Sequence, residues 1–290
     1  MKLRTIKVSV AVLIALMLPS SYGAPSIFAK ALRLAVCGDQ RAVIRKIVDN
    51  EQGHHLRVID SGKVPTGISE GLIVDIGDAK FYVPNYPVDY VQSCIVNGKT
   101  FYENTILQEL QSYIKENAVI LDIGANIGNH SVYWAAKANA KRVYSFEPVQ
   151  DTFKILEKNI QINELTDKVR IYNMGLSNEK INGSISHYDP TNIGATSIKQ
   201  DLNGNLVLDK LDNIEIEEDI IDFVKIDVEG HELEVFQGAK ETLTRYRPTI
   251  FVETFWDKRP RVHEYLTSLG YRLEKSFIGE NYLYVFDNIK

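Results

Sequence analysis

The chain has 290 residues, 44% of them hydrophobic, and 33 basic against 38 acidic side chains give a formal net charge of -5. This length and composition fit one large α/β domain with an N-terminal extension, and they exclude a disordered chain. A net negative charge gives no general attraction for nucleic acid, which is therefore not expected as a partner. The two cysteines, Cys37 and Cys94, show neither CxxC nor Cys/His ligand spacing, so a structural zinc site is not expected.

Residues 1–31 have the layout of a signal peptide or a membrane anchor. Basic residues near the start precede the uncharged residues 8–29, the first half of which is strongly apolar. Such a layout is typical of export signals, and about 20 apolar residues can also cross a bilayer. We expect membrane association through residues 8–29, with an amphipathic helix as the alternative. Residues 32–69 are expected to form a helical and loop extension, and residues 70–290 the main domain.

The main domain is expected to open with a hairpin and a helix. Residues 72–76 and 80–84 flank Gly77-Asp78, which indicates two antiparallel strands. The apolar spacing of residues 104–114 predicts an amphipathic helix. A buried strand follows at residues 119–121.

Beyond this strand, apolar strand patterns and amphipathic helix patterns alternate, which is typical of a parallel sheet. Strands are expected at residues 142–146, 169–174, 223–228 and 249–253, helices at residues 151–163, 232–243 and 262–269, and a final antiparallel pair at residues 271–276 and 282–286. Residues 175–210 are rich in Gly, Ser, Asn and Thr, which indicates a polar excursion or an inserted β-hairpin that shapes a substrate site.

The glycine turn after the strand at residues 119–121 predicts a cofactor site. Asp122 ends the strand, Gly124 and Gly128 form the turn, and a helix is expected to begin near Ser131. Glycines let backbone N–H groups approach a ligand closely, and the N-terminal end of a helix carries partial positive charge. We therefore expect the turn to form the floor of the ligand site.

The ligand suggested by the turn is S-adenosylmethionine. The G-x-G-x-x-G pattern of dinucleotide sites is missing. Asp122 would repel a pyrophosphate, but it suits a cationic sulfonium and ammonium. Asn126 lies between the two glycines of the turn, and Glu147 ends the next strand, where an acid is placed to accept hydrogen bonds from both ribose hydroxyls.

Three carboxylates at the ends of neighbouring strands predict a catalytic cluster. Asp227 and Glu229 follow one buried strand and Glu253 ends the next. They are suited to act as a general base with a pKa raised by mutual repulsion, or to hold a cation such as Mg²⁺ through oxygen ligands. The structural alternative is that Lys225 pairs with one of them and the others cap the helix near Glu232.

Two histidines lie beside these motifs. His130 is expected in the first helical turn after the glycines, and His231 lies beside the carboxylates. Either could shuttle a proton, although a surface or helix-end role is the commoner fate of such residues.

The ordered set of motifs resembles the FkbM-type S-adenosylmethionine-dependent methyltransferases over about residues 80–290. The motifs that carry the resemblance are residues 119–131, Phe146-Glu147-Pro148, Leu208-Asp209, residues 225–232 and residues 248–253, with Tyr102-Glu103 upstream. The resemblance implies the class I methyltransferase fold, an α/β, Rossmann-like arrangement. In that fold a mostly parallel seven-stranded sheet has an antiparallel C-terminal strand and helices on both faces.

The resemblance also implies O-methylation of a hydroxyl on a small-molecule or glycan acceptor, such as a sugar, a glycolipid or a secondary metabolite. It implies contacts between S-adenosylmethionine and Glu103, Asp122, Gly124, Asn126, Gly128, Glu147, Gly175 and Leu176, with Glu147 at the ribose and Gly175-Leu176 at the adenine edge. Asp227 is the first choice as the base or orienting acid, with Glu229, Glu253 and His231 as its neighbours.

Location and two other functions stay open at this stage. The cofactor is made in the cytosol, so a membrane-associated protein is expected to keep its catalytic domain where S-adenosylmethionine is available, and a cytoplasmic protein is the alternative. The other functions are a non-catalytic, membrane-associated binding module on the same fold and an NAD-dependent oxidoreductase.

Overall fold

The computed structural model describes residues 72–277 and 279–287. Residues 1–31, with the signal-like segment, and residues 32–69 lie outside the described residues. Among the residues that are described, no helix has both the length and the apolar character needed to cross a membrane.

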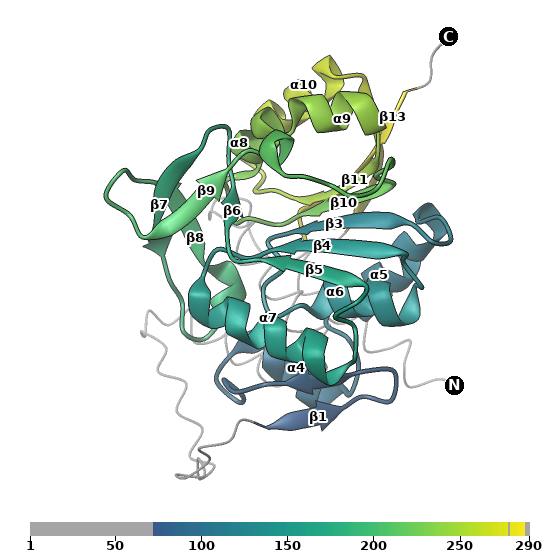
Figure 1. The fold of residues 1–290 in the computed structure, drawn as a ribbon, viewed down its shortest axis with the longest axis vertical. Coiled ribbons are helices and arrows are strands. Elements are labelled where there is room, and N and C mark those ends of the chain that lie inside the picture. The colour runs from purple at the N-terminus through teal and green to yellow at the C-terminus, as the bar shows by residue number, and fades with distance from the viewer. Residues whose placement is uncertain (1–71, 278, 288–290) are drawn as a thin grey trace, which may run out of the picture. The chain divides into compact units, whose positions relative to one another are not determined.

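The core of the domain is a seven-stranded sheet with the strand order β12-β13-β11-β10-β3-β4-β5 (Figure 1). Its strands are β3 (Val119–Ile123), β4 (Arg142–Phe146), β5 (Val169–Tyr172), β10 (Phe223–Ile226), β11 (Thr249–Glu253), β12 (Tyr271–Phe277) and β13 (Asn281–Phe286). The central pairs are parallel, and β13 runs antiparallel to both of its neighbours. The expected sheet, with its antiparallel final strand, is confirmed.

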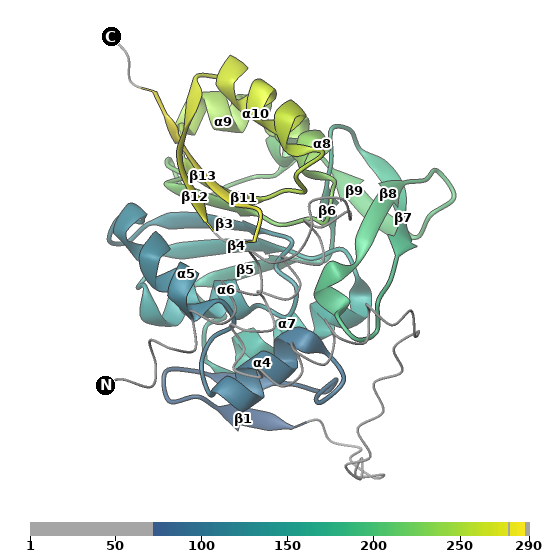
Figure 2. The ribbon, with the colours of Figure 1, turned by 180° about the vertical axis from the view of Figure 1, so that it is seen from behind.

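Helices cover both faces of this sheet, as Figures 1 and 2 show. One face carries α4 (Tyr90–Gly98), α5 (Asn104–Leu110), α6 (Asn129–Val132) and α7 (Gln150–Ile162), and the other carries α8 (Glu232–Gly238), α9 (Lys240–Tyr246) and α10 (Arg259–Ser268). The two faces contribute to two separate hydrophobic clusters. Burial on both sides explains why β3 and β10 are apolar along most of their length instead of alternating.

The N-terminal hairpin is also confirmed, with β1 (Ile73–Asp75) antiparallel to β2 (Lys80–Tyr82). Two asparagines at the end of α7 fasten it to the domain. Asn159 Oδ1, within the helix, accepts from Tyr82 N at 2.6 Å, and Asn163 Oδ1, at the C-cap, accepts from Lys80 N at 2.8 Å. The hairpin therefore belongs to the face that carries α4 to α7.

Four helical segments differ from the sequence predictions. Helix α4 was not predicted, because Val, Cys, Ile and Asn are weak helix formers. The helix predicted at residues 232–243 is divided at Ala239, where a Cβ on the preceding Gly238 would lie 1.9 Å from the carbonyl oxygen of Ser177. The helix after the glycine turn continues from α6 as a π-helix, η2 (Tyr133–Lys137), and α5 ends in a 3-10 turn, η1 (Gln111–Tyr113).

Residues 175–210 form a second sheet with the strand order β6-β9-β7-β8. Its strands are β6 (Gly175–Leu176), β7 (Ile181–His187), β8 (Ser197–Gln200) and β9 (Leu206–Asp209), with the 3-10 turns η3 (Ile193–Ala195) within it and η4 (Leu211–Asn213) after it. The expected insertion is thus a small sheet, which stands to one side of the main sheet (Figure 1).

Candidate functional site

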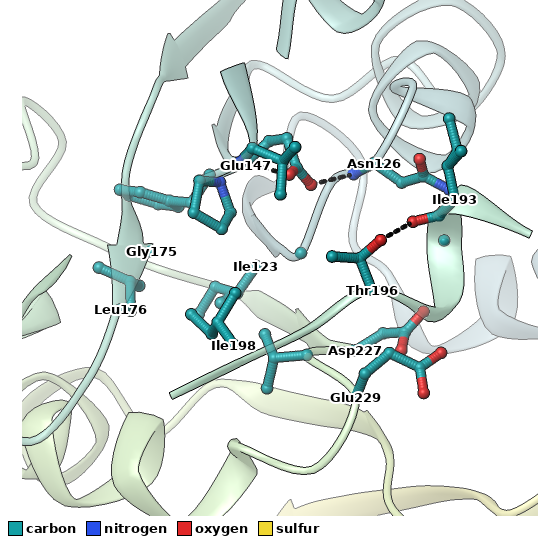
Figure 3. Close-up of a pocket in the computed structure, with 16 residues that line it drawn as sticks. Ile123, Asn126, Glu147, Gly175, Leu176, Ile193, Thr196, Ile198, Asp227 and Glu229 are labelled. Carbon is teal, nitrogen blue, oxygen red and sulfur yellow. Dashed lines mark hydrogen bonds between the residues drawn. The ribbon is translucent and has the colours of Figure 1, made fainter. Parts of the chain in front are cut away.

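A cleft opens where β3, β4 and β10 end and the inserted sheet begins (Figure 3). The residues that line it are Ile123, Gly124, Asn126, Phe146, Glu147, Pro148, Val149, Gly175, Leu176, Ile193, Gly194, Thr196, Ile198, Asp227, Val228 and Glu229. In open α/β sheets, ligands bind beyond the carboxyl ends of the strands. The cleft occupies that position.

The glycine turn has three residues in the left-handed region, Gly124, Asn126 and Gly128, with φ values of 76°, 50° and 87°. A Cβ on Gly124 would lie 1.8 Å from the carbonyl oxygen of Asp227, and a Cβ on Gly128 would lie 2.6 Å from Cδ1 of Leu156. The two glycines therefore let β10 and α7 approach the turn.

Several backbone N–H groups of the turn are already used within the protein. The N–H groups of Gly124 and Ala125 both donate to the carbonyl oxygen of Phe146, at 3.0 and 2.9 Å, and Gly128 N donates to Ala125 O at 2.9 Å. These bonds hold the turn in shape, so the ligand chemistry of the cleft rests on side chains.

Asp122 lies beneath the turn and does not line the cleft. Its carboxylate is fully buried, accepts a hydrogen bond from Ser131 Oγ at 2.5 Å and lies 3.3 Å from Lys225 Nζ. The carboxylate is thus held by Ser131 and Lys225 below the floor of the cleft, and its direct contact with the methyl donor stays a prediction.

Lys225 links this buried carboxylate to the cleft. Its ammonium donates to Gly124 O at 2.6 Å and lies 3.9 Å from Asp227 Oδ2. Burial alone would lower the pKa of Lys225, but the carboxylates of Asp122 and Asp227 outweigh it, and the pKa is raised. The pairing expected as the structural alternative for Lys225 is thus present, and it involves two carboxylates.

Glu147 lines the cleft and is placed as expected for a ribose ligand. Its Oε1 accepts from Val149 N at 2.8 Å and its Oε2 accepts from Asn126 N at 3.1 Å. Burial raises the pKa of this carboxyl to about 7 despite both bonds. Each carboxylate oxygen can accept more than one hydrogen bond, so both can still accept from a ligand.

Polar atoms in and beside the cleft fit S-adenosylmethionine. Asn126 Oδ1 is buried at the turn and has no hydrogen-bond partner within the described part of the chain. Buried acceptors of this kind are rare unless a ligand or water satisfies them. Asn126 and Glu147 lie on the same side of the cleft, and Asp227 faces it from the other (Figure 3).

The inserted sheet supplies the remaining wall. Gly175 and Leu176 line the end of the cleft away from Asp227, and Ile198 lies between them and the carboxylates (Figure 3). Thr196 Oγ1 donates to Ile193 O at 2.7 Å, which fixes the loop over the turn. The sequence indicated that this insertion shapes the site, and the resemblance singled out Gly175 and Leu176. The other lining residues of the insertion, Ile193, Gly194, Thr196 and Ile198, carry no motif.

The predicted carboxylate cluster is only partly assembled. Asp227 and Glu229 line the cleft, with 32% of the Asp227 side chain exposed, whereas Glu253 does not line it. In the described part of the chain no group of three or more His, Cys, Asp or Glu side chains could hold a metal ion. The three carboxylates therefore do not form the magnesium site considered above.

His231 does not line the cleft either. Its Nε2 lies 3.0 Å from Ser177 Oγ and its Nδ1 lies 3.8 Å from Glu234, and burial lowers its pKa. The neighbouring Glu232, the first residue of α8, accepts from Gly230 N at 2.6 Å, and among the described residues no side chain caps the N-terminus of this helix. His231 therefore contacts Ser177 and Glu234 at the start of α8, and its catalytic role stays a prediction.

Glu103 and His130 form a separate pair behind the turn. His130 Nε2 lies 3.6 Å from Glu103 Oε2, and burial lowers the pKa of His130 to about 3, which keeps the imidazole neutral. Asn129 exchanges two hydrogen bonds with the backbone of Tyr102, at 2.9 and 3.0 Å. These bonds bring the upstream motif against the glycine turn, although neither Glu103 nor His130 lines the cleft.

Comparison with known proteins decides the family. A model of the methyltransferase FkbM domain matches residues 122–273, which is more than half of the chain. The chain belongs to the FkbM methyltransferase family. This confirms the resemblance of the motifs and S-adenosylmethionine as the cofactor, and it argues against the NAD-dependent oxidoreductase.

Relatives of this FkbM methyltransferase include the hexuronic acid methyltransferase AglP of Haloferax volcanii, which is 34% identical over 146 residues, 49% of this chain and 58% of AglP. The chain thus spans little more than half the length of that relative. The methyltransferase sdnD of Sordaria araneosa is 24% identical over 56% of this chain and 76% of its own. A solved FkbM methyltransferase from Methylobacillus flagellatus superposes with a TM-score of 0.43 at 16% identity, covering 67% of this chain and 54% of its own.

Proposed function

We propose that this FkbM methyltransferase transfers the methyl group of S-adenosylmethionine to an oxygen of a sugar, with a hydroxyl as the first candidate acceptor. The observation that carries the proposal is the cleft itself, in which Glu147 and Asp227 face each other across the carboxyl ends of the strands. The similarity to AglP, a hexuronic acid methyltransferase, supports a sugar as the acceptor class.

The proposed cofactor residues divide into those that contact the ligand and those that support the contact. Glu147 accepts from the ribose hydroxyls, Asn126 meets the methionine part, and Gly175-Leu176 lies against the adenine edge. The turn itself is supported by a second group of residues, which are Asp122, Gly124, Gly128 and Glu103. S-adenosylmethionine supplies an electrophilic methyl group on a sulfonium.

Asp227 is the proposed base. Its carboxylate is partly exposed in the cleft and lies 3.9 Å from the ammonium of Lys225. A carboxylate at this edge can accept the proton of an acceptor hydroxyl while the oxygen attacks the methyl group from the side opposite the sulfur. Lys225 neutralises part of the charge beneath the site, and Glu229 beside Asp227 adds a second acceptor for substrate hydroxyls.

The test uses methyl β-D-glucuronide and methyl β-D-glucoside as acceptors and follows the release of S-adenosylhomocysteine. We expect the product to be a methyl ether, which is stable to alkali. An alkali-labile methyl ester would instead identify the uronate carboxylate as the acceptor, and methylation of a carboxylate needs no base. Asp227→Asn should bind S-adenosylmethionine normally and lose turnover, whereas Asp151→Asn, on an exposed side chain of α7, should keep both. Turnover by the Asp227→Asn variant would assign the base elsewhere.

The lack of S-adenosylhomocysteine release with these sugars and with a cell extract would favour the non-catalytic binding module. The proposal also includes domain limits at residues 31 and 69 and membrane association through residues 8–29. It places the catalytic domain where S-adenosylmethionine is available. Separation of cell membranes from the soluble fraction, with and without residues 1–31, tests the location.

A further inference from the structure

A pair of adjacent aromatic side chains is exposed beyond the carboxyl end of β11. The exposed fractions are 37% for Phe255 and 61% for Trp256. Large aromatic side chains usually bury most of their surface, and a cluster of them left in solvent marks a contact site more often than a single exposed residue does. We define the aromatic platform as these two residues, which no part of the cofactor site uses.

The platform adjoins the acidic end of the cleft. Glu229 lines the cleft, and a Cβ placed on the next residue, Gly230, would lie 3.4 Å from Cε2 of Phe255. Asp227 and Glu229 lie at the end of the cleft away from Gly175 and Leu176 (Figure 3). The Phe255 ring therefore lies next to the turn that carries Glu229 at the acidic end of the cleft.

The backbone holds the platform in its exposed position. Glu280, in the β12–β13 hairpin, accepts from Trp256 N through Oε1 at 3.0 Å, and its carbonyl oxygen accepts from Thr254 N at 3.1 Å. The carbonyl oxygen of Phe255 accepts from Lys258 N at 2.9 Å. These bonds fix the backbone from which the two rings project, which reduces the entropy lost on binding.

A cation lies beside the rings. Lys258 Nζ donates to Gly230 O at 2.6 Å, and its ammonium forms no ion pair with the described residues. An ammonium has three donors, so two remain for a ligand. Aromatic rings pack against C–H groups through their electron-rich faces, and an ammonium attracts a carboxylate. A sugar ring that carries a carboxylate matches both features.

We propose that Phe255, Trp256 and Lys258 form the acceptor subsite, in which the platform packs against the C–H face of a uronic sugar and Lys258 binds its carboxylate. The identity of this subsite rests on the proposed sugar methylation. The binding surface itself can be tested without turnover, so failure of one is distinguishable from failure of the other.

The experiment uses tryptophan fluorescence of the full chain. The chain has two tryptophans, and Trp134 is fully buried, so acrylamide quenching reports Trp256. Methyl β-D-glucuronide should protect Trp256 from quenching in a saturable manner, and methyl β-D-glucoside should need at least tenfold higher concentration. Lys258→Met should remove that preference.

The matched variants separate a contact from a structural effect. Trp256→Ala should abolish the glucuronide-dependent signal and raise KM for the glucuronide at least tenfold, while the affinity for S-adenosylmethionine stays unchanged. Leu202→Ala, at a side chain that is 78% exposed on the inserted sheet, should change neither quantity. The subsite would be overturned if the glucuronide failed to protect Trp256 of the wild-type protein from acrylamide quenching. An unchanged KM in Trp256→Ala would also overturn it. Absence of methyl transfer with protection intact would overturn the proposed reaction alone.

Discussion

Gly124→Ala tests whether the turn depends on the close approach of β3 and β10. The new Cβ would lie 1.8 Å from the carbonyl oxygen of Asp227, whereas ordinary contact begins at 3.4 Å, so the two strand ends must separate by roughly 1.6 Å. A φ of 76° adds left-handed strain of about 1 kcal/mol, and overpacking adds about 1–3 kcal/mol. We expect a loss of about 2–4 kcal/mol, which lowers Tm by roughly 5–15 °C for a domain of this size.

Gly77→Ala is the matched control. Gly77 has a φ of 90°, but a Cβ there meets nothing within 4 Å, so the substitution carries the backbone strain without the overlap. Its expected cost is about 1 kcal/mol, or roughly 2–4 °C in Tm. Thermal unfolding by circular dichroism and S-adenosylmethionine binding by calorimetry measure both variants. If Gly124→Ala melts as high as Gly77→Ala and binds the cofactor normally, the reasoning about the close approach is refuted.

Three further predictions concern buried charges. Lys225→Met leaves the carboxylate of Asp122 unpaired and should lower the free energy of unfolding, measured in urea, by about 3–5 kcal/mol. Adding Asp122→Asn should recover part of this loss, and no recovery would contradict the pairing. Because burial raises the pKa of Glu147 to about 7, S-adenosylmethionine should bind more tightly as the pH rises through that value. Glu147→Gln should flatten this dependence in calorimetry and weaken binding about tenfold at high pH, and a retained dependence would assign it to another group. The pKa of Glu232 is raised from 4.5 to about 7 by burial, so its contribution to stability is complete below pH 4.5 and is lost as the pH rises through 7. Glu232→Gln should therefore reduce the fall in urea midpoint between these two pH values, and an equal fall would contradict the assignment.

The sequence predicted most of the fold because its strongest patterns are local. Residues 142–146 and 249–253 were assigned with the bounds that the structure has, since short apolar runs between turn signals fit buried strands. Helix α4 was missed for the opposite reason: its residues have weak helix propensity, and the cap at Asp89 together with tertiary packing stabilises it.

The candidate site was predicted unevenly. Glu147 and Asp227 were placed correctly in the cleft because strand ends of a parallel sheet meet at one edge. His231 and Glu253 share the same stretches of sequence but turn away from it. A one-residue difference in a turn, such as the positive φ of Glu229, redirects the side chains that follow, and sequence spacing does not report it.

The sequence by itself determined the family, the cofactor class and the mostly parallel sheet with its antiparallel final strand, because these follow from ordered motifs and from local periodicity. The order of the strands in the sheet came from the structure. Only the tertiary structure decided which polar groups face the ligand. Asp122 was expected to meet the methyl donor, yet the approach of β10 places Lys225 against it and buries both. The same approach uses Gly124 for backbone packing and leaves Asn126, Glu147 and Asp227 as the side chains open to the cleft. Burial and pairing depend on residues about 100 positions apart, which no local pattern in the chain can record.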